Sequence, residues 1–183
     1  DHLDRYDSIE EYQRAKQKVY YGTGVMVINR DDPIVSAMAV AGRDQLGFSL
    51  HESTGYEFGV LTQRGHLWLA EGDAPLMLVS DMKIAGSHNI ANALAALALG
   101  SVMGLPVDAM LKALKEFKGL PHRCRFVREL HGVRWFNDSK ATNVGASIAA
   151  IEGLAENGKI VLIAGGVGKG QNFAPLSPIL KDY

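Results

Sequence analysis

The most informative stretch of the chain is His122–Asn143, with the sequence HRCRFVRELHGVRWFNDSKATN. Its residues predict two short strands joined by a turn at His131-Gly132. Helical spacing of apolar residues begins at Val144, so we expect Thr142 or Asn143 to cap a helix there. Between the second strand and that helix stands a cluster of polar side chains: Asn137, Asp138, Ser139, Lys140, Thr142 and Asn143.

A polar loop between a strand and a helix is a common ligand site in α/β proteins. In open α/β sheets the ligand lies at the carboxyl ends of the strands, and the N–H groups of the first helical turn favour an anion. The residues alone leave two interpretations open: an anion-binding loop, or an ordinary hydrophilic connection.

The composition describes a soluble globular protein whose partner is a small charged molecule. Of 183 residues, 47% are hydrophobic and 21% are charged, with 19 Lys and Arg against 20 Asp and Glu. This balance offers no basic surface, so we expect neither a nucleic acid nor a membrane as a partner. There is no run of about 18 apolar residues and no signal peptide. We therefore expect a cytoplasmic protein and, because the chain opens at Asp1 without methionine, part of a longer polypeptide.

The single cysteine, Cys124, allows neither an internal disulfide nor a zinc-binding cysteine pair. A reducing compartment fits this usage. Its alternation with Phe126 predicts a buried strand thiol rather than a nucleophile.

The first helix is expected to follow a capping box formed by Ser8 and Glu11 and to run to about Tyr20. Its apolar stripe consists of Ile9, Tyr12, Val19 and Tyr20, and Lys16 falls near the centre of that stripe. A lysine in this position either extends its ammonium to water or is partly buried for a functional reason.

The predicted fold class is α/β, with a parallel sheet, a small antiparallel meander and covering helices. Residues 24–29 are apolar on both faces, which predicts an internal strand, and a short helix should follow Asp32-Pro33. Residues 46–79 predict the meander, with turns at residues 63–65 and 71–73. Lys159–Ala164 predicts a second buried parallel strand.

A long helix from Ser87 to Met103 is apolar nearly all round, which predicts a buried helix. Asn89 and Asn92 lie on adjacent faces of its first turns, and an amide offers the donor and acceptor that an adenine edge requires. Packing of both amides against a neighbouring loop is the alternative. The next helix should end near Pro121, which predicts two domains, residues 1–120 and 121–183. Arg123 then suits a phosphate held between domains.

The glycine-rich loop Gly165–Gly170 has the wrong spacing for the common nucleotide motifs. A Walker loop needs a glycine where Ile163 stands, and a dinucleotide fingerprint needs one at Gln171. From spacing alone it is a flexible turn after a strand.

Several of these segments together resemble the Mur ligases, the ATP-dependent amide-forming enzymes of peptidoglycan synthesis. The resemblance runs through most of the chain in the family's order: Asp1-His2, Lys16, Gly86-Ser87-His88-Asn89 with Asn92, Pro121-His122-Arg123, Asn137–Asn143, and Gly165-Gly166 with Lys169. It is nearest to the branch that adds D-glutamate to UDP-N-acetylmuramoyl-L-alanine. It implies the end of a central ATPase domain followed by the start of a Rossmann-like C-terminal domain.

The resemblance also implies roles for individual residues. Lys16 would be carbamylated and would bind Mg²⁺ with His2, so both belong to the metal and acyl-phosphate region. Asn89 and Asn92 would meet the adenine of ATP, Asp138 the ribose and Arg123 the phosphates, where Lys140 adds charge. Thr142 and Lys169 would orient D-glutamate. Val167 departs from the acidic residue expected in the last loop.

The reaction implied is phosphorylation of a carboxylate by ATP, followed by displacement of the phosphate by an amine. We expect a monomer whose substrates are ATP, D-glutamate and UDP-N-acetylmuramoyl-L-alanine. No Walker loop occurs in the 183 residues, so we expect the chain alone to be inactive. Two alternatives remain, namely another Mur or folylpolyglutamate-type ligase, and a non-catalytic α/β binding module.

Overall fold

The computed structural model describes every residue except 1–4, 53, 85, 156–157, 169 and 183. These residues form two compact units. The N-terminal unit runs to Lys83 and adds Asn89–Phe117, whereas the C-terminal unit consists of Ile84–His88 and the chain from Lys118 onward.

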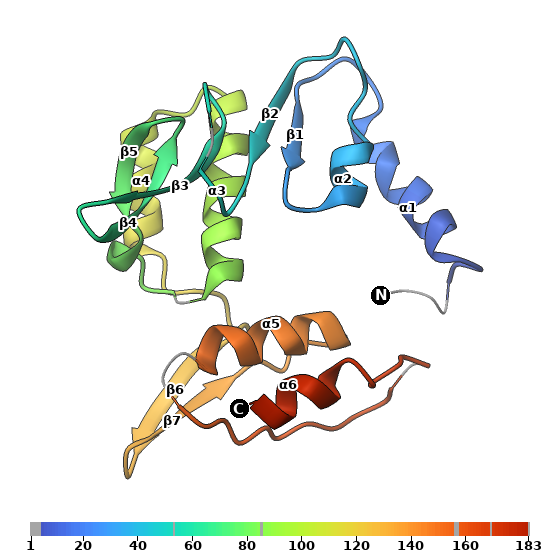
Figure 1. Cartoon of the computed structure of the whole chain (residues 1–183), viewed down its shortest axis with the longest axis vertical. Coiled ribbons are helices and arrows are strands. Elements are labelled where there is room, and N and C mark those ends of the chain that lie inside the picture. The colour runs from blue at the N-terminus through green and yellow to red at the C-terminus, as the bar shows by residue number, and fades with distance from the viewer. Residues whose placement is uncertain (1–4, 53, 85, 156–157, 169, 183) are drawn as a thin grey trace. The chain divides into compact units, whose positions relative to one another are not determined.

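The N-terminal unit is built on a five-stranded sheet in the order β1-β2-β3-β4-β5 (Figure 1). Strands β1 and β2 are parallel, and β2 meets β3 in parallel through the single pair Phe48 and Phe58. Strands β3, β4 and β5 form the predicted antiparallel meander. The strands span Met26–Asn29, Gln45–Phe48, Phe58–Gln63, His66–Glu71 and Ala74–Leu78.

Two strand predictions are corrected by this topology. Strand β1 lies at the edge of the sheet among the described residues, not inside it. Strand β2 was expected within the meander but pairs in parallel with β1. Both errors have one cause, because an apolar pattern reports which faces of a strand are covered and not which strand lies beside it.

The hydrophobic core of this unit lies between the sheet and helix α3, Ser87–Val102. The sheet contributes Phe58 and Leu69, and α3 contributes Leu94 and Leu97, all of them at most 1% exposed. The prediction that α3 is buried all round was wrong, since Leu99 is 53% exposed. The 3-10 turn Val79–Asp81 follows β5, and helix α4 spans Val107–Glu116 without a buried residue.

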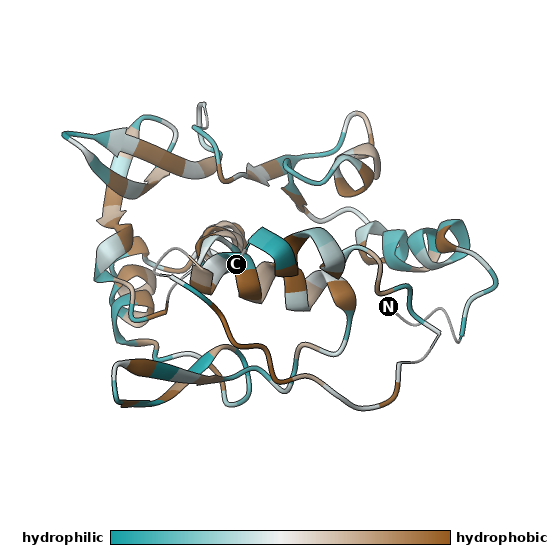
Figure 2. Ribbon diagram, turned by 60° about the horizontal axis from the view of Figure 1, so that its bottom comes forward, coloured by the Kyte–Doolittle hydropathy of each residue, from teal (hydrophilic) through white to brown (hydrophobic). Residues whose placement is uncertain are grey.

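Helix α1, Ile9–Gln17, begins at the predicted capping box. The Ser8 hydroxyl accepts a hydrogen bond from the Glu11 amide at 3.2 Å, while the Glu11 carboxylate accepts one from the Asp7 amide at 3.0 Å. A 3-10 turn, Lys18–Tyr20, continues the helix to its predicted end. No residue of α1 is buried, and the helix is largely hydrophilic (Figure 2).

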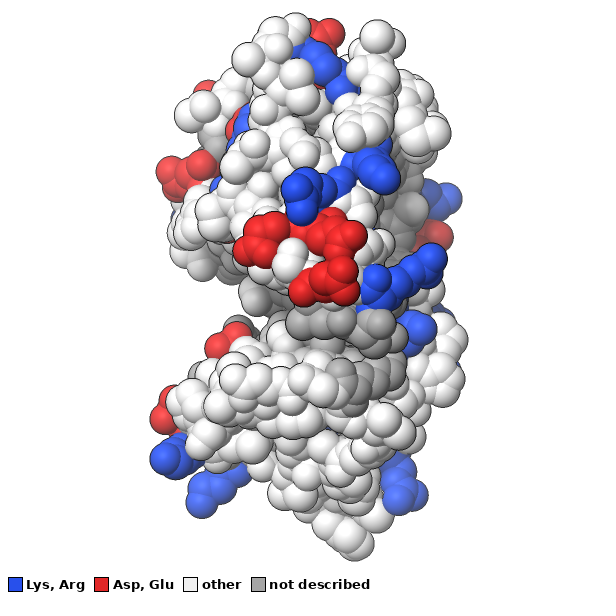
Figure 3. All heavy atoms as spheres, turned by 90° about the vertical axis from the view of Figure 1, so that its right-hand side faces the viewer, with Lys and Arg blue, Asp and Glu red and all other residues white. Residues whose placement is uncertain are grey.

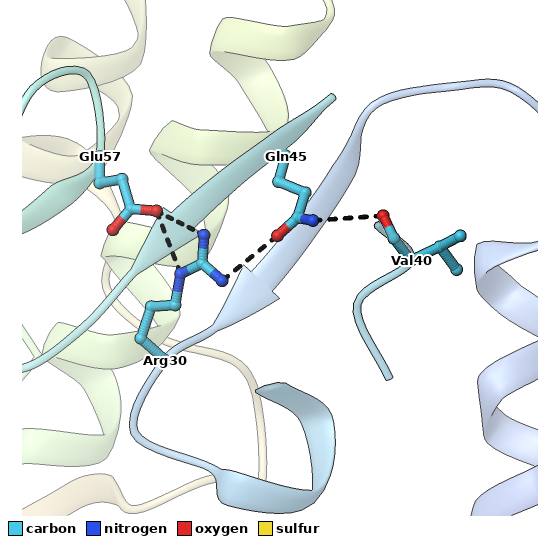
Figure 4. Close-up of polar contacts among 4 residues, drawn as sticks. All are labelled: Arg30, Val40, Gln45 and Glu57. Atoms are coloured by element: carbon cyan, nitrogen blue, oxygen red, sulfur yellow. Dashed lines mark hydrogen bonds and ion pairs between the residues drawn. The ribbon is translucent and has the colours of Figure 1, made fainter. Parts of the chain in front are cut away.

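A polar network links Arg30, which follows β1, to the first residue of β2 and to the residue that precedes β3 (Figure 4). Arg30 donates twice to one carboxylate oxygen of Glu57, at 3.0 and 2.6 Å, and once to Gln45 at 3.4 Å. A β-carbon at Gly47 would collide with that Glu57 oxygen, so glycine leaves room for the ion pair. Beside it, the Asp32 carboxylate caps the short helix α2, Pro33–Ala37, by accepting from two backbone amides.

The C-terminal unit contains the predicted hairpin, made of β6, Arg125–Leu130, and β7, Val133–Asn137. His131 and Gly132 both have positive φ, 52° and 75°, as a tight two-residue hairpin turn requires. Helix α5, Val144–Ala155, packs against helix α6, Leu176–Asp182.

The predicted strand Lys159–Ala164 does not form in the described part of the chain, where these residues take no regular secondary structure. Val161 and Ile163 are 88% and 81% exposed. Their apolar sequence favours a strand, but a strand also needs a hydrogen-bonding neighbour. Among the described strands of this unit, β6 and β7 pair with each other.

Candidate functional site

The polar cluster after β7 is clasped to the residues that precede β6. The Lys140 amide donates to the His122 carbonyl at 3.0 Å, and the Cys124 amide donates to the Asp138 carboxylate at 3.0 Å. The two segments therefore run side by side and place Arg123 across from Asp138 and Lys140. Arg123 and Lys140 are exposed, whereas Asp138 is half-buried. We call this arrangement, residues 122–124 with residues 137–140, the clasp.

The imidazole of His122 completes the clasp. Its Nδ1 atom lies 3.3 Å from the Asn137 amide nitrogen and 3.1 Å from the Ser139 hydroxyl. With both groups donating, this nitrogen acts as an acceptor. His122 and Cys124 have positive φ, 64° and 42°, so the bonds hold the backbone in a conformation that such residues rarely adopt. Sequence reasoning quoted His122 as part of a motif and gave it no role.

Cys124 reports on the electrostatics of the clasp. Burial raises the pKa of its thiol to about 11, and the charge of Asp138 and a hydrogen bond to that carboxylate add to the rise. A thiol held in its neutral form is a poor nucleophile, which agrees with the expectation that Cys124 is not one. The expected buried position in a strand is not found, since Cys124 is half-buried and precedes β6.

Thr142 and Asn143 follow the clasp at the start of α5. The Asn143 side chain accepts from the Ala146 amide at 2.8 Å, which confirms it as the helix cap. The Gln171 side chain donates to the Thr142 carbonyl at 3.2 Å and accepts from the Val144 amide at 3.0 Å. Gln171 thus ties the glycine-rich loop to the loop that carries Thr142, and no sequence signal pointed to this link.

Asn89 and Asn92 occupy the first turns of α3, where the sequence placed them. Asn89 is half-buried and Asn92 is exposed. Neither amide belongs to the hydrophobic core, which α3 forms with residues further along the helix. The structure does not test the adenine role predicted for them.

Lys16 is exposed on α1, so the partial burial that one interpretation required is not found. Its ammonium lies 5.4 Å from the centre of the Tyr12 ring, a cation–π contact within one helical turn. Lys16 is exposed because the described structure buries no residue of α1. The side of the molecule on which α1 lies shows acidic side chains gathered beside Lys and Arg side chains (Figure 3).

Two predicted site residues, His2 and Lys169, lie outside the described residues. Within the part that is described, no group of three or more His, Cys, Asp or Glu side chains could hold a metal ion. The remaining predicted residues divide between the units. Arg123, Asp138, Lys140 and Thr142 belong to the C-terminal unit, and Lys16, Asn89 and Asn92 to the N-terminal unit.

Residues 1–100 match the family model described as the Mur ligase middle domain. The chain belongs to the Mur ligase family. This match covers the N-terminal sheet, α1 and most of α3, and therefore includes Lys16, Asn89 and Asn92. None of the helices that the structure describes has the length and apolar character needed to cross a bilayer.

Mur ligases from several bacteria are similar to this chain over nearly its whole length. The UDP-N-acetylmuramoylalanine--D-glutamate ligase of Nitrosococcus oceani is 52% identical over 177 residues, which are 97% of this chain and 39% of that protein. The ligase of the same name from Pseudomonas aeruginosa is 48% identical over 178 residues, 96% of this chain and 40% of that protein. The chain thus spans about two fifths of the curated relatives that it matches.

Solved Mur ligases share the fold at lower identity. MurF from Acinetobacter baumannii aligns with a TM-score of 0.64 and 21% identity, over 84% of this chain and 34% of that one. The UDP-N-acetylmuramate-alanine ligase of Thermotoga maritima gives a TM-score of 0.63 and 22% identity, over 85% and 36%. The predicted α/β class and the Mur ligase fold are confirmed.

Proposed function

We propose that this chain is part of an ATP-dependent ligase that adds D-glutamate to UDP-N-acetylmuramoyl-L-alanine in peptidoglycan precursor synthesis. The observation that supports this most is the 52% identity to a ligase of that name over nearly the whole chain. The clasp supports it independently, because its hydrogen bonds hold the backbone that carries Arg123 beside the backbone that carries Asp138 and Lys140, where a strand ends and a helix begins.

Each part of the clasp suits one part of ATP. Arg123 and Lys140 are exposed cations that can neutralise phosphate charge, and a guanidinium can bind two phosphate oxygens at once. The Asp138 carboxylate keeps hydrogen-bonding capacity after it accepts from Cys124, and a ribose hydroxyl can use that capacity. Asn89 and Asn92 would bind the adenine edge through their amides.

Mg²⁺ bound with ATP would neutralise charge on the phosphate oxygens during transfer. The residues that would bind this metal are His2, which lies outside the described residues, and Lys16 as a carbamate. A carbamate on Lys16 would supply the oxygen ligands that Mg²⁺ prefers, and the exposed position of Lys16 on α1 would leave those oxygens accessible to the metal ion.

Thr142 and Lys169 would hold the incoming D-glutamate. Thr142 is exposed at the amino end of α5, where helix N–H groups favour a carboxylate. Gln171 binds the Thr142 carbonyl, which supports an acceptor site on the C-terminal unit. We further propose that the complete enzyme is a cytoplasmic monomer with its residues 1–120 and 121–183 in separate domains.

The test is a chimera in which this chain replaces the matching 39% of the Nitrosococcus oceani ligase. Phosphate release is measured with ATP, UDP-N-acetylmuramoyl-L-alanine and one amino acid at a time. We expect turnover with D-glutamate and none with other amino acids or with the chain alone. Turnover with L-lysine, diaminopimelate or a folate substrate instead would assign a different ligase, and turnover by the chain alone would overturn the view that it holds part of a site.

Lys16 has its own test in the same chimera. Lys16→Ala should abolish phosphate release, and a short carboxylic acid added as a substitute for the carbamate should restore part of it. Lys18→Ala is the matched control, since Lys18 is an exposed lysine of the following 3-10 turn. Full activity of Lys16→Ala would remove Lys16 from the site.

A further inference from the structure

The turn before α3 packs against α5 through two glycines. A β-carbon at Gly86 would lie 3.6 Å from the α-carbon of Gly153, and one at Gly153 would lie 3.4 Å from the α-carbon of Gly86. Segment Ile84–His88 and α5 belong to the same compact unit, so this contact is internal to it. Glycine at both positions lets the two backbones approach closely.

The imidazole of His88 fills the remaining space at this contact. A β-carbon at Gly153 would lie 3.4 Å from Cε1 and 3.5 Å from Nδ1 of that ring, and one at Gly86 would come within 2.9 Å of Cε1. Gly86 also has a φ of 98°, which other residues rarely adopt. The Nδ1 atom of His88 is buried and has no hydrogen-bond partner among the described residues, so this side of the ring is held by packing.

His88 is the second residue of α3 and directly precedes Asn89. Helical geometry makes the first turn of α3 rigid, so a displacement of His88 changes the direction of the Asn89 and Asn92 amides. Displacements of about 1 Å in a binding group are enough to weaken a reaction about a hundredfold.

We propose that His88 is a positioning residue, and that its packing against Gly153 sets the adenine-binding amides of Asn89 and Asn92. This proposal rests on the proposed function, because it requires these asparagines to bind adenine. It assigns a part in nucleotide binding to Gly153, which lies more than 60 residues from either asparagine in the sequence.

The test compares two glycines of α5 in the chimera. Gly153→Val places methyl groups against His88, whereas Gly145→Val meets only the Asn143 side chain, at 3.5 Å from its β-carbon. Both changes put the same β-branched residue into the same helix. For Gly153→Val we expect the KM for ATP to rise about fivefold or more, with kcat and the KM for D-glutamate nearly unchanged. Gly145→Val should leave the KM for ATP unchanged.

A double variant shows whether the contact itself is responsible. Removing the ring in His88→Ala should raise the KM for ATP. Adding Gly153→Val should then raise it less than it does in the original chimera, because the valine no longer meets an imidazole and keeps only its contact with the Gly86 backbone. The proposal would be overturned if the fold-change in the KM for ATP of the double variant equalled the product of the two single fold-changes. It would also be overturned if Gly145→Val raised this KM as much as Gly153→Val.

A third variant separates this proposal from the function on which it depends. If Asn92→Ala leaves the KM for ATP unchanged, the adenine assignment fails and the proposal fails with it. If Asn92→Ala raises the KM and Gly153→Val does not, the adenine assignment stands and only the positioning role is refuted.

Discussion

Replacing Asp138 with asparagine should make Cys124 more reactive. The Asp138→Asn change removes the negative charge, but the amide oxygen of the new side chain can still accept the Cys124 N–H bond that closes the clasp at 3.0 Å. The backbone contact is therefore kept while the charge is lost. Because that charge is one of the causes that raise the thiol pKa, its loss should lower the pKa.

The size of the effect follows from the causes of the shift. A thiol with a pKa of about 11 is about 1% thiolate at pH 9. Burial is the largest single cause and remains in the variant, so part of the rise is kept. We expect the thiolate fraction at pH 9 to rise about three- to tenfold, which corresponds to about half a pKa unit to one unit.

The assay is the rate of alkylation by iodoacetamide between pH 8 and pH 11. The thiolate is the reacting species, and the chain has a single cysteine, so the rate reports on Cys124 alone. The control is Asp108→Asn, which removes the charge of an exposed aspartate in the first turn of α4. An Asp138→Asn rate equal to that of the original chain would show that the carboxylate does not lie beside the thiol, and the clasp would be wrong.

The same shift predicts a dependence of stability on pH. The folded state favours the neutral thiol, so its contribution to stability is complete below the unfolded pKa of about 9 and is lost as the pH rises towards 11. Urea unfolding at pH 8 and pH 10.5 should show a smaller decrease for Asp138→Asn than for the original chain.

Three further predictions concern turns and loops of the two units. Gly72→Ala should cost about 2–4 kcal/mol in urea unfolding, because its β-carbon would collide with the Gly55 carbonyl at a φ of 55°. Gly65→Ala, in the hairpin turn that has open space around it, should lower the free energy of unfolding by only about 1 kcal/mol. Equal losses for the two variants would contradict the contact between residue 72 and the Gly55 carbonyl. Arg43→Met removes hydrogen bonds to the Tyr20 and Gly24 carbonyls, so amide hydrogen exchange in residues 18–25 should accelerate, whereas the exposed-turn control Arg64→Met should leave it unchanged. Gln171→Ala should raise the KM of the chimera for D-glutamate several-fold by freeing the Thr142 loop, and an equal effect of the neighbouring Asn172→Ala would refute that link.

The features that the sequence predicted correctly are those decided by neighbouring residues. The His131-Gly132 turn, the Asn143 cap and the capping box of Ser8 and Glu11 each depend on a few consecutive side chains and backbone groups. Their chemistry is complete within one turn, so the sequence contains all the information that the prediction needs.

The predictions that failed depend on partners distant in the sequence. The parallel pairing of β2 with β1, and the lack of a strand at Lys159–Ala164 in the described chain, are decided by which segment lies alongside, and an apolar pattern does not state this. Lys16 was placed on an apolar stripe, but a stripe is buried only if another element covers it.

The site was predicted only in part for a related reason. The family resemblance pointed to Arg123, Asp138 and Lys140, and the structure holds the two backbone segments that carry them side by side in the clasp, while their roles stay predictions. The residues that hold them were missed, because His122 acts partly through its backbone carbonyl and Gln171 binds backbone groups. A bond to a backbone group can form whatever residue stands at the partner position, so it produces no sequence motif.

The central claim is that these residues serve one ATP-dependent ligation. Its most direct test is a crystal structure of the chimera with a non-hydrolysable ATP analogue, Mg²⁺ and D-glutamate. We predict that the Asn92 amide lies at the adenine, the Asp138 carboxylate at the ribose and the Arg123 guanidinium at the phosphates. A nucleotide bound away from all three side chains would contradict the account.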